Sequence, residues 1–121
     1  MKDVFYEFAE QSARLGEYLQ HHGVLLSTAE SCTGGLLSGI ITMTPGSSQW
    51  FDRGFVTYSN DAKMAMLDVA ANTLEKHGAV SEEVAIQMAE GVLFNVPTSA
   101  LAVSVTGVAG PGGGTEAKPV G

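Results

Sequence analysis

Two short apolar runs each lead into a glycine-rich segment, and this pairing constrains the fold more than any other feature of the sequence. The first run is 24–28, before the turn at 30–35, and the second is 100–105, before the glycines of 106–114. Runs of four to eight mostly apolar residues bounded by turn residues are typical of buried β-strands. Both runs therefore predict strands of a layered domain.

The rest of the chain alternates between helical and strand patterns. Apolar residues at three- and four-residue steps, from Phe5 to Leu19, predict a helix over about 3–21. The further elements that we expect are a helix over 33–42, a strand over 50–58 interrupted or bulged at Gly54, a helix over 59–69, a short helix with a capping box at 72–75 that ends at Gly78, and a helix that Ser81 caps and Pro97 ends. Together they predict a single α/β domain over 1–121, a layered sheet flanked by helices.

The composition is that of a small acidic protein with an ordinary core. Of 121 residues, 45% are apolar and 16% are charged, which supports one domain. The net charge of −7 argues against a broad basic face for nucleic acid. No apolar run approaches the roughly 20 residues of a membrane helix, and the first residues do not resemble a secretory leader. A single cysteine, Cys32, excludes an internal disulfide framework and fits a reducing cytoplasm.

The first candidate site is the segment 28–35, at the transition from strand to helix. Ser31 is expected at the carboxyl end of a strand and at a helix N-terminus, where free N–H groups can hold an anion or a developing oxyanion. Gly34 and Gly35 would let a substrate approach the backbone closely. Alternatively, Ser31 only caps the helix. Cys32 is a rival nucleophile, or else a small buried hydrophobic residue.

The second candidate is Lys63, in the segment 58–63. We expect Lys63 in the first turn of a helix, where the helix N-terminus and burial both lower the pKa of the amine. A neutral amine can accept a proton from a serine, as in Ser–Lys hydrolytic sites. The alternative is a surface lysine with its ammonium in water.

The third candidate is the segment 105–114, which follows a strand as phosphate-binding loops do. It matches neither the Walker A motif nor G-x-G-x-x-G. The part from Thr106 to Gly110 indicates a built turn, whereas 112–114 alone would be a flexible connection. No spacing of cysteine and histidine suggests zinc, so we expect neither a metal nor a cofactor.

In this order, the segments 28–35 (TAESCTGG), 54–63 (GFVTYSNDAK) and 106–113 (TGVAGPGG) resemble the C-terminal domain of competence/damage-inducible protein A. The similarity extends over essentially the whole chain, and the first helix resembles the stand-alone form of the family. That family includes nicotinamide-nucleotide amidohydrolases. Its members continue past the last residues of this chain with a further strand and helix, including basic residues for the substrate phosphate. We therefore expect a chain truncated at its C-terminus.

The resemblance implies hydrolysis of the carboxamide of nicotinamide mononucleotide to nicotinic acid mononucleotide and ammonia, in pyridine-nucleotide salvage. It also implies that Ser31 is the nucleophile, Lys63 its base and Tyr58 an assisting group. The residues expected to bind substrate are Glu30, Cys32, Thr33, Gly34, Gly35, Thr106, Gly107, Ala109 and Gly110. The expected partner is a small-molecule nucleotide, and the expected protein is a cytoplasmic homo-oligomer that binds neither nucleic acid nor membrane.

Two other functions fit parts of the pattern. A non-catalytic nucleotide-binding or sensor domain of the same fold would keep the glycine loops but would not need both Ser31 and Lys63. A structural oligomerisation domain would need an exposed apolar stripe on the first helix. For the hydrolase, the backbone N–H groups of 32–34 are the candidate oxyanion donors.

Overall fold

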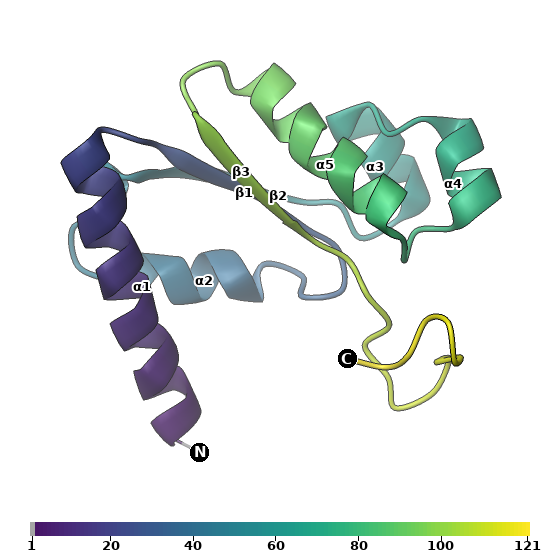
Figure 1. Cartoon of the computed structure of the whole chain (residues 1–121), viewed down its shortest axis with the longest axis horizontal. Coiled ribbons are helices and arrows are strands. Elements are labelled where there is room, and N and C mark those ends of the chain that lie inside the picture. The colour runs from purple at the N-terminus through teal and green to yellow at the C-terminus, as the bar shows by residue number, and fades with distance from the viewer. Residues whose placement is uncertain (1) are drawn as a thin grey trace.

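The computed structural model describes residues 2–121 as a three-stranded sheet between two layers of helices (Figure 1). In chain order the elements are α1 (Lys2–His22), β1 (Leu26–Glu30), α2 (Leu36–Thr42), the 3₁₀ helix η1 (Ser47–Gln49), β2 (Phe51–Val56), α3 (Asn60–Leu67), α4 (Ala71–His77), α5 (Glu82–Asn95) and β3 (Leu101–Val105). The strands are parallel in the order β2-β1-β3. The predicted α/β class with a layered sheet flanked by helices is confirmed.

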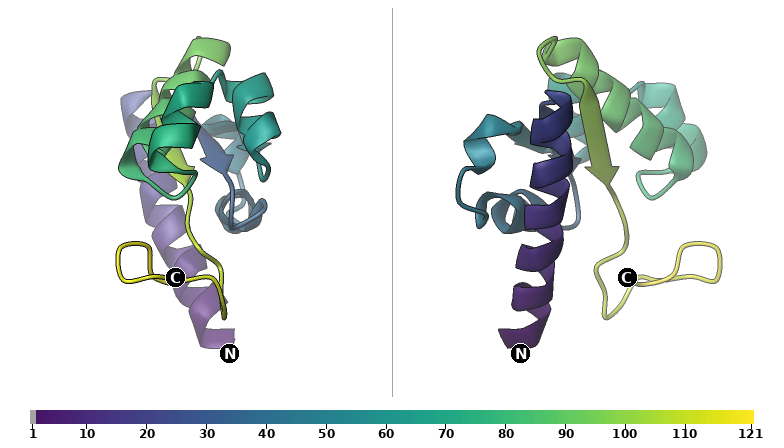
Figure 2. Two further views of the ribbon diagram at one scale, coloured as in Figure 1. Left: turned by 90° about the vertical axis from the view of Figure 1, so that its right-hand side faces the viewer. Right: turned by 60° about the vertical axis from the view of Figure 1, so that its left-hand side comes forward.

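Helices α1 and α2 lie on one face of the sheet, and α3, α4 and α5 lie on the other (Figure 1 and Figure 2). The central strand β1 is buried along its whole length. Because side chains of a strand alternate between faces, Leu26 packs with Trp50 beside α1 and α2, whereas Ala29 packs beside α5. The larger core lies on the α5 side and contains Leu67, Val69, Leu74, Val84, Met88, Val92 and Val96.

Only the C-terminal half of α1 packs closely on the sheet, and its first turns project beyond it (Figure 1). Leu19 is buried, and Gly16 lies against the indole of Trp50, where a side chain would collide. Phe5 and Phe8, by contrast, are exposed. An open apolar groove therefore runs between α1, α2 and β3.

Several elements begin later than their sequence patterns indicate. Gly23 adopts a left-handed conformation and the Val24 N–H donates to the carbonyl of Leu19, so closing α1 delays the start of β1 by two residues. Helix α2 begins only after a turn over 32–35. Strand β2 is continuous through Gly54, and the bulge predicted there is confirmed, because the pairing of β1 with β2 shifts register just before Gly54.

The start of α4 does not use the capping box predicted at 72–75. Ala70 occupies the cap position without a side-chain bond, and its own N–H donates to the side chain of Gln87 on α5 over 3.0 Å. A tertiary contact thus replaces the local one. Gly78 ends α4 and Ser81 caps α5 as predicted.

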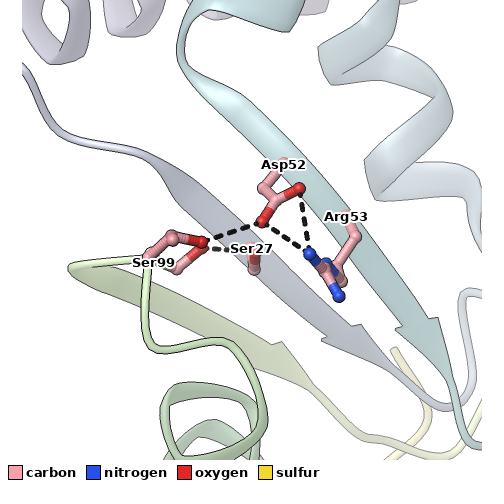
Figure 3. Close-up of polar contacts among 5 residues, drawn as sticks. Ser27, Asp52, Arg53 and Ser99 are labelled. Atoms are coloured by element: carbon pink, nitrogen blue, oxygen red, sulfur yellow. Dashed lines mark hydrogen bonds and ion pairs between the residues drawn. The ribbon is translucent and has the colours of Figure 1, made fainter.

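At the amino end of the sheet, polar side chains join the start of β3 to the other two strands (Figure 3). The hydroxyls of Ser27 and Ser99 lie 2.7 Å apart, and Thr98 donates to Asp52 over 3.4 Å. Asp52 also pairs with Arg53 at 3.1 Å. The segments predicted to form the functional site lie at the opposite, carboxyl end.

Candidate active site

The three candidate segments meet at the carboxyl edge of the sheet, because each one follows the end of a parallel strand. Ser31 directly follows β1, the central strand. Its N–H donates to the carbonyl of Val105 over 2.9 Å, and the Thr57 N–H donates to the carbonyl of Glu30 over 2.8 Å. The backbone at Ser31 is therefore held by both neighbouring strands.

The structure brings Ser31 and Lys63 into direct contact. Lys63 Nζ donates to Ser31 Oγ over 2.9 Å and to the backbone carbonyl of Tyr58 over 3.0 Å. The lysine is 1% exposed and the serine 7% exposed, which excludes a solvated surface lysine. Helix α3 directs Lys63 toward β1, because Ser59 begins that helix by accepting a hydrogen bond from the Ala62 N–H.

The environment of Lys63 favours its neutral form. Burial lowers the pKa of the amine, while the electrostatic interaction with Cys32 acts in the opposite direction and is the smaller effect. This is the direction expected from the sequence, with burial as the principal cause. A buried amine with a lowered pKa, in hydrogen-bond contact with a hydroxyl, can accept its proton.

Glu30 is completely buried, and its carboxylate holds the start of α2. It accepts hydrogen bonds from the Thr33 hydroxyl, the Leu37 N–H, and both the N–H and the hydroxyl of Ser38, over 2.6–2.9 Å. Burial raises the pKa of this carboxyl, but these hydrogen bonds outweigh burial and lower the pKa overall. Glu30, rather than Ser31, satisfies the free N–H groups of α2, so the interpretation of Ser31 as a cap is wrong.

A tight turn connects Ser31 to α2. Gly34 and Gly35 have φ angles of 59° and 105°, which side chains strongly disfavour. The Gly34 N–H donates to the carbonyl of Ser31 over 3.0 Å, so it is already engaged. Of the three candidate oxyanion donors, the N–H groups of Cys32 and Thr33 have no partner among the hydrogen bonds of residues 2–121.

The structure shows how Tyr58 and Cys32 lie relative to Lys63, which the sequence does not specify. Tyr58 is 71% exposed, and its backbone carbonyl, not its phenol, contacts Lys63. Cys32 is partly buried, and a Cβ atom on Gly107 would lie 3.5 Å from its sulfur. Ser31, and not Cys32, is bonded to the lysine amine.

The glycine-rich segment after β3 folds back on itself. The Thr106 hydroxyl donates to the carbonyl of Ala79 over 2.9 Å, and the Val108 carbonyl accepts from the N–H of the last residue over 2.8 Å. Gly110 has a left-handed φ of 83°, and Ala109 is exposed. The chain is extended over 106–109 and bends at 110–113, so the built turn predicted from Thr106 to Gly110 is not formed there, although Thr106 and Val108 are each held by a hydrogen bond.

Residues 2–121, the described part of the chain, contain no group of three or more histidine, cysteine, aspartate or glutamate side chains that could hold a metal ion. They also contain no helix that is both long and apolar enough to span a bilayer.

Residues 9–121 match the family defined by the CinA C-terminal domain. The chain belongs to this family. The match covers the Ser31–Lys63 contact, the turn before α2 and the glycine-rich segment, so the resemblance seen in the three sequence motifs is confirmed.

Curated relatives in the CinA family include proteins of two lengths. The CinA-like protein of Chloroherpeton thalassium is 57% identical over 88% of this chain, which spans 25% of that protein. Nicotinamide-nucleotide amidohydrolase PncC of Escherichia coli is 51% identical over 95% of this chain, which spans 69% of that enzyme. The enzyme of the same name from Enterobacter agglomerans is 54% identical over 93% of this chain, which spans 68% of it.

Solved structures of CinA proteins have the same fold. The competence/damage inducible protein CihA from Agrobacterium tumefaciens superposes with a TM-score of 0.86 at 51% identity, covering 93% of this chain and 68% of its own. A CinA superfamily protein from Klebsiella pneumoniae superposes with a TM-score of 0.89 at 38% identity, covering 94% of this chain and 71% of its own.

Proposed function

We propose that this chain hydrolyses the carboxamide of nicotinamide mononucleotide to nicotinic acid mononucleotide and ammonia. The names of the Escherichia coli and Enterobacter agglomerans relatives, at 51% and 54% identity, support this substrate class. The observation that carries the proposal is the 2.9 Å contact between Ser31 Oγ and the buried amine of Lys63. That contact supplies a nucleophile and a base at the edge where ligands of parallel sheets bind.

In the proposed reaction, neutral Lys63 takes the proton of Ser31 while the serine oxygen attacks the carboxamide carbon. The N–H groups of Cys32 and Thr33 are the donors for the oxyanion of the tetrahedral intermediate. The Lys63 ammonium then gives its proton to the departing nitrogen, which leaves as ammonia. Water, activated by the same amine, hydrolyses the acyl-enzyme and restores Ser31.

The remaining predicted residues take two kinds of role in this proposal. Gly34, Gly35 and Gly107 would let the nucleotide approach the backbone, and the segment with Thr106, Ala109 and Gly110 would contact the nucleotide beside them. Glu30 and Thr33 would fix the turn that carries the oxyanion donors. The side chain of Tyr58, which is exposed, would assist from the solvent side of the site. As an enzyme of pyridine-nucleotide salvage, the protein would act in the cytoplasm, as a homo-oligomer.

The decisive experiment measures ammonia released when the protein is incubated with nicotinamide mononucleotide. The wild type should release ammonia stoichiometrically with nicotinic acid mononucleotide, and Ser31→Ala should release almost none. The matched control is Cys32→Ala, which removes the neighbouring rival nucleophile and should stay active. Circular dichroism shows whether each variant is folded. Calorimetric binding of the nucleotide by a folded wild type that releases no ammonia would favour a non-catalytic nucleotide-binding domain instead.

A further inference from the structure

Thr57, the first residue after β2, carries a buried hydroxyl that nothing in the described structure satisfies. The residue is completely buried, and among residues 2–121 its Oγ1 is the buried side-chain polar atom without a hydrogen-bond partner. Its neighbours Val56 and Tyr58 are 46% and 71% exposed, so the Thr57 side chain points into the protein. Buried hydroxyls are normally paired, and an exception needs a physical reason.

The strand register places this hydroxyl on the same side of the sheet as the Ser31–Lys63 pair. Ala29 pairs with Phe55 in the ladder, and the Thr57 N–H continues that ladder to Glu30. Because strand side chains alternate, Ser31 and Thr57 follow Ala29 and Phe55 onto the face that packs against α3 and α5. Helix α3 is the element that carries Lys63.

The amine of Lys63 has room for one more hydrogen bond. Besides its bond to Cε, the nitrogen has three bonding directions, and an ammonium fills all three with N–H groups. In the described structure it contacts Ser31 Oγ and the Tyr58 carbonyl. Thr57 precedes Tyr58 in the chain and lies beside Ser31 in the sheet, so it adjoins both of those partners.

We propose that Thr57 Oγ1 is the third hydrogen-bond acceptor of the Lys63 amine, engaged when Lys63 takes the proton of Ser31. The inference rests on the proposed hydrolase function. The proton moves from Ser31 Oγ to Lys63 Nζ, and Thr57 contributes only a lone pair to the new N–H. Thr57 is thus a positioning residue that stabilises the ammonium and makes Lys63 a stronger base.

The charges around Lys63 allow this effect to be isolated. Cys32, in the turn after β1, is the titratable side chain whose electrostatic interaction with the amine opposes the effect of burial. The carboxylate of Glu30 is bound to α2 on the opposite face of the sheet. Both groups are retained in Thr57→Val and in Thr57→Ser, so an effect that is seen in the first variant and absent in the second reports the Thr57 hydroxyl.

Two variants test the proposal. Thr57→Val replaces the hydroxyl by a methyl group and should lower the rate of ammonia release at saturating nucleotide about tenfold, as expected for one hydrogen bond to a charged group. The ammonium loses an acceptor, so the pKa of Lys63 falls and the rising limb of the pH–rate profile moves to lower pH. The thermal midpoint should stay equal or rise, because an unpaired hydroxyl is removed. Thr57→Ser keeps the hydroxyl and should restore turnover to near the wild-type rate.

A measurement independent of turnover follows the Lys63 side chain directly. In protein labelled with ¹³C-lysine, the Lys63 signal is assigned by its absence in Lys63→Met, and its titration is compared between wild type and Thr57→Val. A lower pKa in Thr57→Val supports the contact, even where the wild type releases no ammonia and the proposed function itself has failed. Unchanged titration and turnover in Thr57→Val overturn the inference. Equal losses in Thr57→Val and Thr57→Ser with lowered thermal midpoints also overturn it, because packing would then explain them.

Discussion

Replacing Glu30 by Gln should destabilise the fold strongly, although the two side chains have the same length and shape. The carboxylate accepts from Thr33 and Leu37 on one oxygen and from two groups of Ser38 on the other. Glutamine has a single acceptor oxygen, so its NH₂ group must face one of these two pairs of donors. A hydroxyl can rotate and become an acceptor, but the backbone N–H of Leu37 or Ser38 cannot.

The magnitude follows from the groups left without a partner. One buried backbone N–H without an acceptor costs about 1–3 kcal/mol. The bonds that remain lose their charge assistance, which is worth roughly 1 kcal/mol for each bond to an ionised group. We therefore expect Glu30→Gln to lower the free energy of unfolding by about 3–5 kcal/mol, which for a domain of this size is a fall of about 10–20 °C in the thermal midpoint.

The assay is urea unfolding at pH 7 followed by circular dichroism. The matched control is Glu10→Gln, an exposed glutamate on α1, which should change the free energy of unfolding by less than about 0.5 kcal/mol. If Glu30→Gln unfolds at the same urea concentration as this control, the start of α2 does not depend on the carboxylate and the reasoning is wrong.

The difference in stability between the wild type and Glu30→Gln should also depend on pH. The pKa of Glu30 is lowered in the folded state relative to its ordinary value of 4.5, so the unfolded chain binds the proton first as the pH falls. The stabilisation from Glu30 is therefore complete above the ordinary pKa and is lost as the pH falls through the folded-state pKa. The difference in stability between wild type and Glu30→Gln should narrow in this acid range, and a constant difference would contradict the assignment.

Three further outcomes follow from the same contacts. Lys63→Arg should lose as much ammonia release as Lys63→Ala, because a guanidinium keeps its charge but cannot give up its proton; near-normal turnover would show that Lys63 supplies charge only. Because burial lowers the pKa of Lys63, the wild-type rate should rise with pH through an apparent pKa below the ordinary 10.5, measured from turnover against pH. Gly91→Ala should lower the free energy of unfolding, measured in urea, by about 1–3 kcal/mol, since its Cβ would overlap the carbonyl of Leu67. The control Gly39→Ala, whose Cβ would point into open space from α2, should raise the free energy of unfolding by about 0.5–1 kcal/mol.

Local patterns in the sequence place Ser31 and Lys63 separately, and the resemblance of the three motifs to the CinA family is what implies that they form one site. An apolar strand that ends in a glycine turn puts Ser31 at the carboxyl edge of a sheet. A capping serine four residues before Lys63 puts that lysine one turn into a helix, where it can reach back to the strand end. Both patterns are local, so periodicity and cap chemistry suffice to predict them.

The roles of Glu30, Tyr58 and Thr57 could not be predicted, because they depend on contacts between elements. The carboxylate of Glu30 became a cap only because the turn delays α2 until Leu36. Nothing in the order of residues tells whether Tyr58 acts through its phenol or its carbonyl. In the sequence, Thr57 looks like any other β-branched strand residue. That its hydroxyl is buried without a hydrogen-bond partner depends on how the elements pack.

The central position of β1 also determines how readily the backbone amides near Ser31 exchange their hydrogens with solvent. The Ser31 amide hydrogen is bonded to Val105, so it exchanges with solvent deuterium only when β1 and β3 separate at that point. Residues 112–117 are exposed, and their amides should exchange through local opening at a much lower free energy. Because the two regions open independently, the glycine-rich segment could rearrange around an entering nucleotide while the hydrogen bond between Lys63 and Ser31 stays in place.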